Sequence, residues 1–424
     1  MYVLMPIRWL LVFWMFAISA ISFLDRVNIS IAGRFIQQEF HITDLQLGNV
    51  FSAFLLGYAL FQAPAGRLAD RFGPRLILTL GTLWWGVFTA LTAMVSASMA
   101  SLLLVLLAVR FSLGTGEAVL FPASNRLVAN WIPSKERGLA NGIIFAGVGA
   151  GAGVTPPLVT YIVLHYGWRA SFWISAVIGL AAGVAWYWMA RDRPEDHPWI
   201  TAEETALIEQ GLPELPAELE IGKPLPWRTI LRSKDVLAIA FSYFTYGYAA
   251  WIFFAWFFIY LSKVRGLDLK SSSYYSMLPF IAMATGSTVG GRISDVLTRR
   301  FGNRIGRCGV AVAGIALAAV FIASGTQVES ARLASIVLAG GAGALYLSQS
   351  SFWSVTADMG GRSAGSVSGV MNMGAQIGGI VTASLTPLIA AQFSWTASFL
   401  VAAALCAAGS LAWLVVDPDV ELGH

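Results

Sequence analysis

The sequence predicts an all-α membrane protein with twelve transmembrane helices in two pseudo-symmetric six-helix bundles. Composition is the first reason: of the 424 residues, 57% are hydrophobic and 12% are charged, roughly half the charged share of a soluble domain. Apolar runs long enough to cross a hydrocarbon core of ~30 Å recur along the chain, and a loop pattern of the first half returns in the second. We therefore expect no sizeable soluble domain.

The apolar runs place the expected helices, in order, at residues 8–32, 46–68, 74–97, 100–130, 138–164, 169–191, 235–262, 272–298, 304–324, 330–356, 363–391 and 394–416. The first run resembles a signal peptide because a charged residue precedes it. It continues apolar beyond Asp25 and Arg26 without a small-residue cleavage site, so we interpret it as the first membrane helix.

One long polar stretch, residues 192–234, separates the sixth helix from the seventh. Within it, Glu204 follows Thr201 by three residues, which is the pattern of a capping box at the start of a short surface helix. The sequence therefore predicts an N-terminal bundle over residues 1–191, a cytoplasmic linker with a short helix over 192–234, and a C-terminal bundle over 235–424.

The charge pattern predicts topology. Most of the 27 Lys and Arg residues lie in one set of loops and in the tails, and cytoplasmic loops carry such an excess. Both termini are therefore expected in the cytoplasm, and the net charge of +4 does not indicate a nucleic-acid partner. Cys308 and Cys406 lie in apolar runs and the four His residues are scattered in loops or the tail, so we expect neither a metal site nor a cofactor.

Four charged residues lie inside apolar runs: Asp25 and Arg26 in the first helix, and Arg110 and Glu117 in the fourth. Charge is unfavourable in a bilayer, so such residues usually face an internal cavity and mark a substrate or ion path. Arg110 and Glu117 are seven residues apart and share a helix face, and the glycines between them suggest a cavity wall. Two alternatives stay open: the first pair lies at the outer interface, and the second is a purely structural ion pair.

A repeated motif relates the two halves. GRLADRFG begins at Gly66 and GRISD at Gly291, and the same offset of 225 residues separates Asp70 from Asp295. A repeat of this kind indicates a transporter whose binding site lies between the two halves near the middle of the membrane. The alternative is an ordinary basic loop that only sets topology.

The loop GRLADRFGPR between the second and third helices resembles the signature loop of the major facilitator superfamily. The resemblance covers essentially the whole chain and implies that the halves close on the cytoplasmic side, with Asp70 meeting a helix N-terminus or a nearby Arg. The residues expected to form this closure, called the latch residues below, are Gly66, Asp70, Arg71, Arg137 and Asp295.

Further segments resemble the anion:cation symporter family, which includes bacterial sugar-acid carriers and animal carriers of sialic acid and vesicular glutamate. They read LDRVNIS, VRFSLGTGEAVLFPASN, WIPSKERGLANG and DRPEDHPWIT. The resemblance implies that Arg110 and Arg26 bind the substrate carboxylate and that Glu117 and Asp25 carry protons. It also implies polyol-binding residues on the tenth and eleventh helices, where this chain has Trp353 and Asn372.

Elementary electrostatics agrees with these roles. Two acids and two Arg sum to zero charge, so an entering anion leaves a buried net charge unless a proton enters with it. We expect Glu117 to pair with Arg110, so that protonation of Glu117 frees Arg110 for the substrate. Tyr58 and Gln376, which follows Asn372 by four residues, are expected to bind substrate hydroxyls; packing and interhelical hydrogen bonding are the alternatives.

Together these observations predict a proton-coupled symporter that imports an organic anion by alternating access across a bacterial inner membrane. A sugar acid such as a hexonate, hexuronate or glucarate is the expected substrate, and the carrier is expected to act as a monomer in the bilayer. The alternative on the same fold is a proton-driven exporter of drugs or other metabolites, against which the paired Arg residues argue. No nucleophile–base set, nucleotide loop or signalling domain indicates an enzyme or a receptor.

Overall fold

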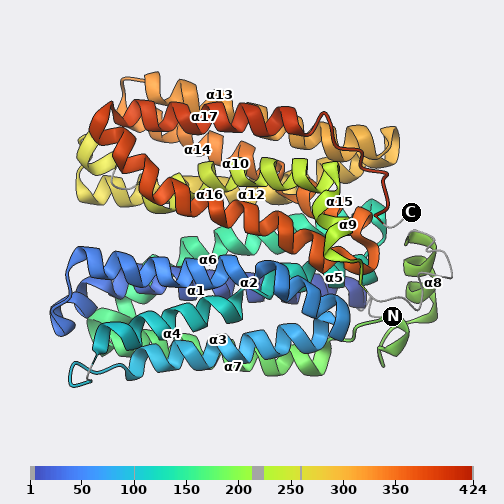
Figure 1. The fold of residues 1–424 in the computed structure, drawn as a ribbon, viewed down its shortest axis with the longest axis horizontal. Coiled ribbons are helices and arrows are strands. Elements are labelled where there is room, and N and C mark those ends of the chain that lie inside the picture. Colours follow the sequence, from blue (N-terminus) through green and yellow to red (C-terminus); the bar gives the residue numbers. More distant parts are fainter. Residues whose placement is uncertain (1–4, 100, 213–223, 258–259, 423–424) are drawn as a thin grey trace.

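A computed structural model describes residues 5–422 apart from residues 100, 213–223 and 258–259. The regular elements of this part are helices, and most of them run along the long axis of the molecule (Figure 1). The elements up to the linker are α1 (Ile7–Phe40), α2 (Asp44–Phe72), α3 (Pro74–Met94), α4 (Leu102–Glu117), α5 (Leu120–Trp131), α6 (Arg137–Tyr166), α7 (Trp168–Met189) and α8 (Ala202–Gly211). The later ones are α9 (Trp227–Arg232), α10 (Lys234–Ala255), α12 (Leu269–Phe301), α13 (Val310–Gln327), α14 (Ala331–Leu347), α15 (Gln349–Gly360), α16 (Ala364–Gln392) and α17 (Trp395–Ala412).

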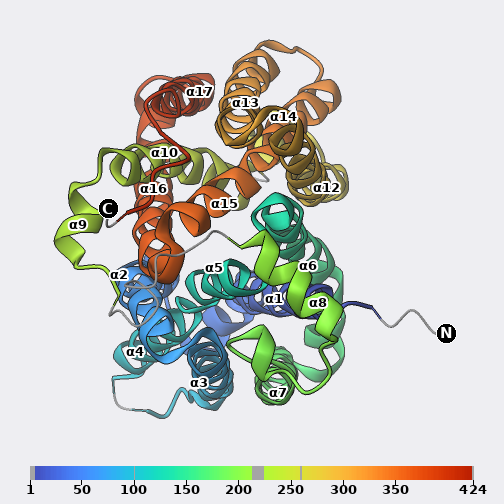
Figure 2. The same ribbon diagram turned by 90° about the vertical axis from the view of Figure 1, so that its right-hand side faces the viewer.

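The long helices form two groups, which Figure 2 shows end on: α1 to α7 lie in one group and α10 to α17 in the other. The most extensive contacts between the groups are those of α2 with α16 and of α6 with α12, and α5 and α6 also pack against α15 or α16. Both chain ends lie at the same end of the molecule as α8 and α9, and this end is called the linker end below (Figure 1). The domain boundaries that the sequence suggested stay predictions.

Ten stretches of the described residues are long and apolar enough to cross a membrane. One of them, Ala331–Gln392, contains two successive crossings, α14 with α15 and then α16. The serine- and tyrosine-rich α12 is not among the ten, although it is as long as the other crossings. With it, the structure has the predicted architecture of twelve crossings in two bundles.

Two expected helices are broken. The fourth is divided between α4 and α5 after Glu117, because Pro122 has no N–H to donate to the carbonyl of Ala118. The tenth is divided at Ser348, whose hydroxyl donates to the carbonyl of Leu345 at 2.6 Å and competes with the helical backbone pattern. The two breaks occur at corresponding places in the two halves, directly beside the residues expected to form the site.

Glycines set the closest approaches between the two groups. A Cβ on Gly66 of α2 would overlap the carbonyl oxygen of Gly365 on α16, and a Cβ on Gly291 of α12 would overlap that of Gly138 on α6. The repeated motif therefore begins, in both halves, at a glycine that lets a helix of the other half come into backbone contact.

The linker is attached to both groups. As expected, Thr201 caps α8 by accepting from the N–H of Glu204 at 3.2 Å. The Glu204 carboxylate does not complete a capping box; it accepts from the N–H groups of Ile7 and Arg8, each at 3.0 Å, and so caps α1. Leu225 accepts from the Arg67 guanidinium and donates to the Ser363 hydroxyl at 2.8 Å, which bridges the two groups.

We expect Gly66→Ala to lower the melting temperature of the purified protein, because the added methyl group forces α2 and α16 apart and overpacking costs about 1–3 kcal/mol. Gly48→Ala is the matched control, since a Cβ there meets nothing within 4 Å and alanine favours the helix. Thermal unfolding in detergent measures both variants. Equal melting temperatures for the two variants would contradict this account of the α2–α16 contact.

Candidate functional site

A cavity lies between the two groups near the middle of the helices, with about 500 Å³ of space free of protein atoms, including its opening. Aromatic rings form most of its wall, and a few polar groups interrupt them. The first group contributes Phe23, Arg26, Tyr58, Phe121, Phe145 and Val148. The second contributes Tyr243, Tyr246, Gly247, Ala250, Trp251, Phe254, Tyr346, Gln349, Asn372, Ala375 and Gln376.

Arg26 is the cationic residue of this wall. Its Nε lies 2.7 Å from Oε2 of Glu117, which also accepts from the Ser22 hydroxyl at 2.9 Å. The guanidinium lies over the ring of Tyr58, 4.1 Å from its centroid, and 4.7 Å from that of Phe23. Glu117 is fully buried and the Arg26 side chain is 8% exposed, so an ion pair between α1 and α4 stands at the edge of the cavity.

The prediction that Glu117 pairs with Arg110 is wrong in this structure. Seven residues along a helix correspond to a rise of roughly 10 Å, too far for direct contact, so a cation from the neighbouring helix α1 reaches Glu117 instead. Arg110 is buried outside the cavity lining, with its guanidinium 5.0 Å from the ring centroid of Phe54. Its Nε and Nη1 have no hydrogen-bond partner among the described residues.

The glycines beside Glu117 do not form a cavity wall as the sequence suggested. A Cβ on Gly114 would overlap the carbonyl oxygen of Phe54, and one on Gly116 would overlap the ring of Trp84. These glycines therefore allow α4 to pack tightly against α2 and α3, which holds the Arg110 and Glu117 backbone in place.

Asp25 points away from the cavity, into the first group. It is 2% exposed, and its Oδ2 accepts from the Thr89 hydroxyl of α3 at 3.5 Å. The sequence left open that the first helix ends near Asp25 and Arg26, at the outer interface. This alternative is wrong, because α1 continues to Phe40. Asp25 and Arg26 thus point to different sides of one helix: the acid is enclosed, and the cation reaches the cavity.

The polar groups of the opposite wall come mostly from α15 and α16. Asn372 Nδ2 donates to Gln62 Oε1 at 2.8 Å, so this predicted residue lines the cavity and also joins the halves. Gln376 lines the cavity too, and its Oε1 has no partner in the described part of the chain. Gln62 was not predicted, although it follows Tyr58 by four residues and so shares its helix face.

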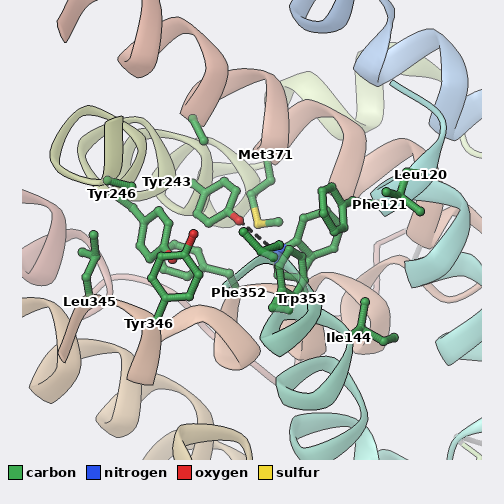
Figure 3. Close-up of a cluster of buried hydrophobic side chains, with 14 of the residues drawn as sticks. Leu120, Phe121, Ile144, Tyr243, Tyr246, Leu345, Tyr346, Phe352, Trp353 and Met371 are labelled. Carbon is green, nitrogen blue, oxygen red and sulfur yellow. Dashed lines mark hydrogen bonds between the residues drawn. The ribbon is translucent and has the colours of Figure 1, made fainter. Parts of the chain in front are cut away.

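Trp353 is not part of the cavity lining. It belongs to a cluster of buried rings between the halves, nearer the linker end, where its Nε1 donates to the Tyr243 hydroxyl at 3.0 Å (Figure 3). Its ring lies 5.0 Å from that of Phe145 and 5.8 Å from that of Phe121. The Tyr243 hydroxyl also accepts from Gln349 Nε2 at 2.7 Å, which ties this ring cluster to the cavity wall.

The latch residues form two matching contacts at the linker end. Asp70 of α2 accepts from the N–H groups of Gly365 and Ser366, at 2.9 and 2.7 Å, at the start of α16. Asp295 of α12 accepts from those of Gly138 and Leu139, at 2.9 and 2.6 Å, at the start of α6. Each repeated Asp therefore caps a helix of the other half, where the helix dipole favours an anion.

Charged side chains complete the two contacts. Arg137 forms an ion pair with Asp358, and Arg307 Nη1 lies 2.8 Å from Asp295. Arg126 Nε lies 3.9 Å from Asp70, whereas the latch residue Arg71 is exposed and lies over the ring of Phe72. Sequence reasoning missed Arg126, Arg307 and Asp358, for which no residue spacing gave a signal.

We expect Asp295→Asn to open the linker end, because a neutral amide accepts more weakly from the α6 N-terminus and leaves Arg307 without its anion. Spin labels at Lys135 and Arg300, both exposed, report the distance between the halves. The variant should shift the distance distribution to longer values by several ångströms. Asp268→Asn is the matched control, since Asp268 caps α12 from within its own half; a shift equal in both variants would contradict the latch.

A comparison with family models finds that the Major Facilitator Superfamily model matches residues 15–383. Among curated proteins, the chain is 36% identical to a probable sulfoacetate transporter of Cupriavidus necator, over 94% of this chain and 91% of that protein. It is 31% identical to a hexuronate transporter of Bacillus subtilis, over 95% and 92% of the two chains. It is also 30% identical to a probable L-galactonate transporter of Escherichia coli, over 94% and 87%.

Among solved structures, the proton:xylose symporter XylE bound to 6-bromo-6-deoxy-D-glucose superposes with a TM-score of 0.77 over 97% of each chain. Sequence identity in that alignment is 14%, so the likeness shows the fold alone.

Proposed function

The chain belongs to the major facilitator superfamily, and we propose that it imports an organic anion together with protons by alternating access. We propose that this anion is a sugar acid. Transporters of hexuronate, L-galactonate and sulfoacetate among its relatives support the anion class. We further propose that the protein lies in a bacterial inner membrane with both termini in the cytoplasm, and that a monomer suffices for transport.

The ion pair between Arg26 and Glu117 carries this proposal. Arg26 faces the cavity, but its Nε is held by Glu117 at 2.7 Å. A substrate carboxylate therefore competes with Glu117 for the same guanidinium. Protonation of Glu117 removes that competitor, and the planar guanidinium is then available to hold the carboxylate through two hydrogen bonds. The proton and the anion consequently favour each other's binding.

Charge balance extends the argument to the whole site. Asp25, Arg26, Arg110 and Glu117 are buried together and sum to zero when all are ionised. An anion that binds alone leaves a net negative charge in a region of low dielectric, whereas an anion that enters with a proton does not. Asp25 is the second proton-linked group in this proposal. Arg110, which lies outside the cavity, acts as a fixed positive charge for both acids.

The rest of the wall suits the body of a sugar acid. The Oε1 atoms of Gln376 and Gln349, which have no partner among the described residues, can accept hydrogen bonds from substrate hydroxyl groups. Aromatic rings such as those of Tyr246 and Trp251 offer flat faces for the C–H surface of a sugar. We propose that the carboxylate lies at Arg26 and that the hydroxyl-bearing end points toward α15 and α16.

Uptake into proteoliposomes tests the function. We expect one of a panel of labelled acids — a hexonate, a hexuronate, glucarate and sulfoacetate — to accumulate only when an inward proton gradient is imposed. Glu117→Gln should abolish accumulation and keep exchange of internal for external substrate, because the neutral amide imitates the protonated state. Glu203→Gln, an exposed change on α8, is the control and should behave as the original protein.

Accumulation that persists in Glu117→Gln would contradict the coupling role of Glu117. If none of the acids moves, the importer proposal fails and a proton-driven exporter becomes the better account of the fold.

A second prediction separates the two arginines. Arg26→Lys should raise KM for the transported acid by about tenfold or more, since a charge-assisted contact is worth about 1.5–3 kcal/mol and lysine cannot reproduce the planar geometry. Arg110→Lys should leave KM within about threefold, because Arg110 does not line the cavity. Initial uptake rates over a range of substrate concentrations measure both. A larger effect at Arg110 would show that the substrate reaches deeper than the cavity.

A further inference from the structure

Charge is distributed unevenly over the cavity wall. Among the described residues that line the cavity, Arg26 is the only one with a full charge, and it belongs to the first helix group. The polar side chains that the second group contributes are neutral: they are tyrosines, one tryptophan, and the amides Gln349, Asn372 and Gln376. The cavity therefore offers a cation to one acidic group of a substrate.

The second buried arginine of the site does not supply another cation to the cavity. Arg110 is 2% exposed and lies outside the lining, with its guanidinium 5.0 Å from the ring centroid of Phe54. The guanidinium of Arg26 lies 5.5 Å from the same centroid. Both cations therefore lie near Phe54 in the first group. A carboxylate at the far end of a six-carbon substrate held at Arg26 would have neither of them as a partner.

The amides of the second group are arranged to accept hydrogen bonds from a substrate. Gln349 Nε2 donates to the Tyr243 hydroxyl at 2.7 Å, and Asn372 Nδ2 donates to Gln62 Oε1 at 2.8 Å. The Oε1 atoms of Gln349 and Gln376, by contrast, have no partner in the described part of the chain. A hydroxyl group has a proton to donate to such an oxygen, whereas an ionised carboxylate has none. This wall therefore suits hydroxyl groups and opposes a second carboxylate.

We propose that the site selects sugar acids with a single carboxylate, such as hexonates and hexuronates, over the dicarboxylates of the same sugars. Gln349 and Gln376 are its specificity-determining residues. The inference rests on the proposed function, which places the substrate carboxylate at Arg26. A second carboxylate would be buried against amide oxygens without a cation, and an unpaired buried charge is strongly unfavourable.

Charge balance favours the same selectivity. Asp25, Arg26, Arg110 and Glu117 sum to zero when all are ionised, so one proton compensates one carboxylate of the substrate. A dicarboxylate that enters with one proton leaves one negative charge uncompensated in a region of low dielectric.

Two matched acids test the inference on the purified, unmodified protein. D-Gluconate and D-glucarate share their carbon chain and stereocentres and differ only at C6, which is a hydroxymethyl group in the first and a carboxylate in the second. Thermal unfolding at neutral pH with increasing acid concentration gives an apparent Kd, because a ligand of the folded state raises the melting temperature. We expect gluconate to bind at least about tenfold more tightly than glucarate.

The C6 monoamide of D-glucarate separates charge from shape. It keeps the size of glucarate and loses the second charge, so it should also bind at least about tenfold more tightly than glucarate. D-Galactonate and galactarate repeat the comparison with the opposite configuration at C4.

A variant should reverse the preference. Gln376→Arg adds a cation to the α16 wall, in place of an amide whose Oε1 has no partner among the described residues. It should shift the ratio of glucarate to gluconate affinity toward glucarate by about tenfold or more, because the second carboxylate gains a charge-assisted partner. Gln376→Met is the matched control: it removes the amide without adding charge and should not reproduce this shift. The monoamide comparison uses only the original protein, so it decides the question even if Gln376→Arg does not fold.

Several outcomes would overturn the selectivity. They are a dicarboxylate that binds as tightly as its hexonate, a monoamide that binds no better than glucarate, and a folded Gln376→Arg variant whose affinity ratio is unchanged. Tighter binding of sulfoacetate, which also carries two acidic groups, than of either hexonate would overturn it as well.

These measurements and the uptake assay fail separately. If glucarate accumulates under a proton gradient as well as gluconate does, the importer proposal stands and the selectivity is lost. If gluconate binds selectively while no acid accumulates, the selectivity stands and the importer proposal fails. If none of the acids stabilises the protein, both are wrong.

Discussion

Charge neutrality inside the first helix group is the constraint on which the site depends. Asp25, Arg26, Arg110 and Glu117, two of each sign, are buried together beside the cavity, where an uncompensated charge is unfavourable by several kcal/mol. Only Arg26 of the four reaches the cavity. The others are held behind it by packing and hydrogen bonds, so a change of charge at the cavity wall acts on them through the protein interior and not by direct contact.

The surrounding fold holds these four side chains in place. Glycines allow α4 to approach α2 and α3 at backbone distance, which positions Glu117 within reach of α1. Aromatic contacts flank the cavity: Phe121, Phe145 and Trp353 meet on the side of the linker end, and the rings of Phe23 and Phe254 lie 5.9 Å apart. The helix breaks after Glu117 and at Ser348 separate the segments that carry the linker-end rings from the rest of their helices.

The sequence predicted the architecture well because long apolar runs and a repeated loop are local signals. It also predicted that Asp25, Arg26, Arg110 and Glu117 are buried, since charges inside such runs are conspicuous. It did not predict their pairing. Spacing along one helix places Arg110 and Glu117 on the same face. Which cation reaches Glu117 depends on how α1 is rotated and positioned against α4, and in the structure it is Arg26. The exclusion of Trp353 from the cavity and the roles of Arg126 and Asp358 likewise depend on contacts between segments far apart in the chain.

The caps made by Asp70 and Asp295 have a consequence for how the molecule opens. Each carboxylate joins the halves chiefly through backbone N–H groups at the first turn of a helix. Water hydrates such exposed helix ends readily, so separation exchanges one set of hydrogen bonds for another and leaves no donor stranded. In the proposed alternating-access cycle the protein passes through both an open and a closed shape, and two helix ends facing two carboxylates provide a closure with specific geometry that can exchange its hydrogen bonds with water.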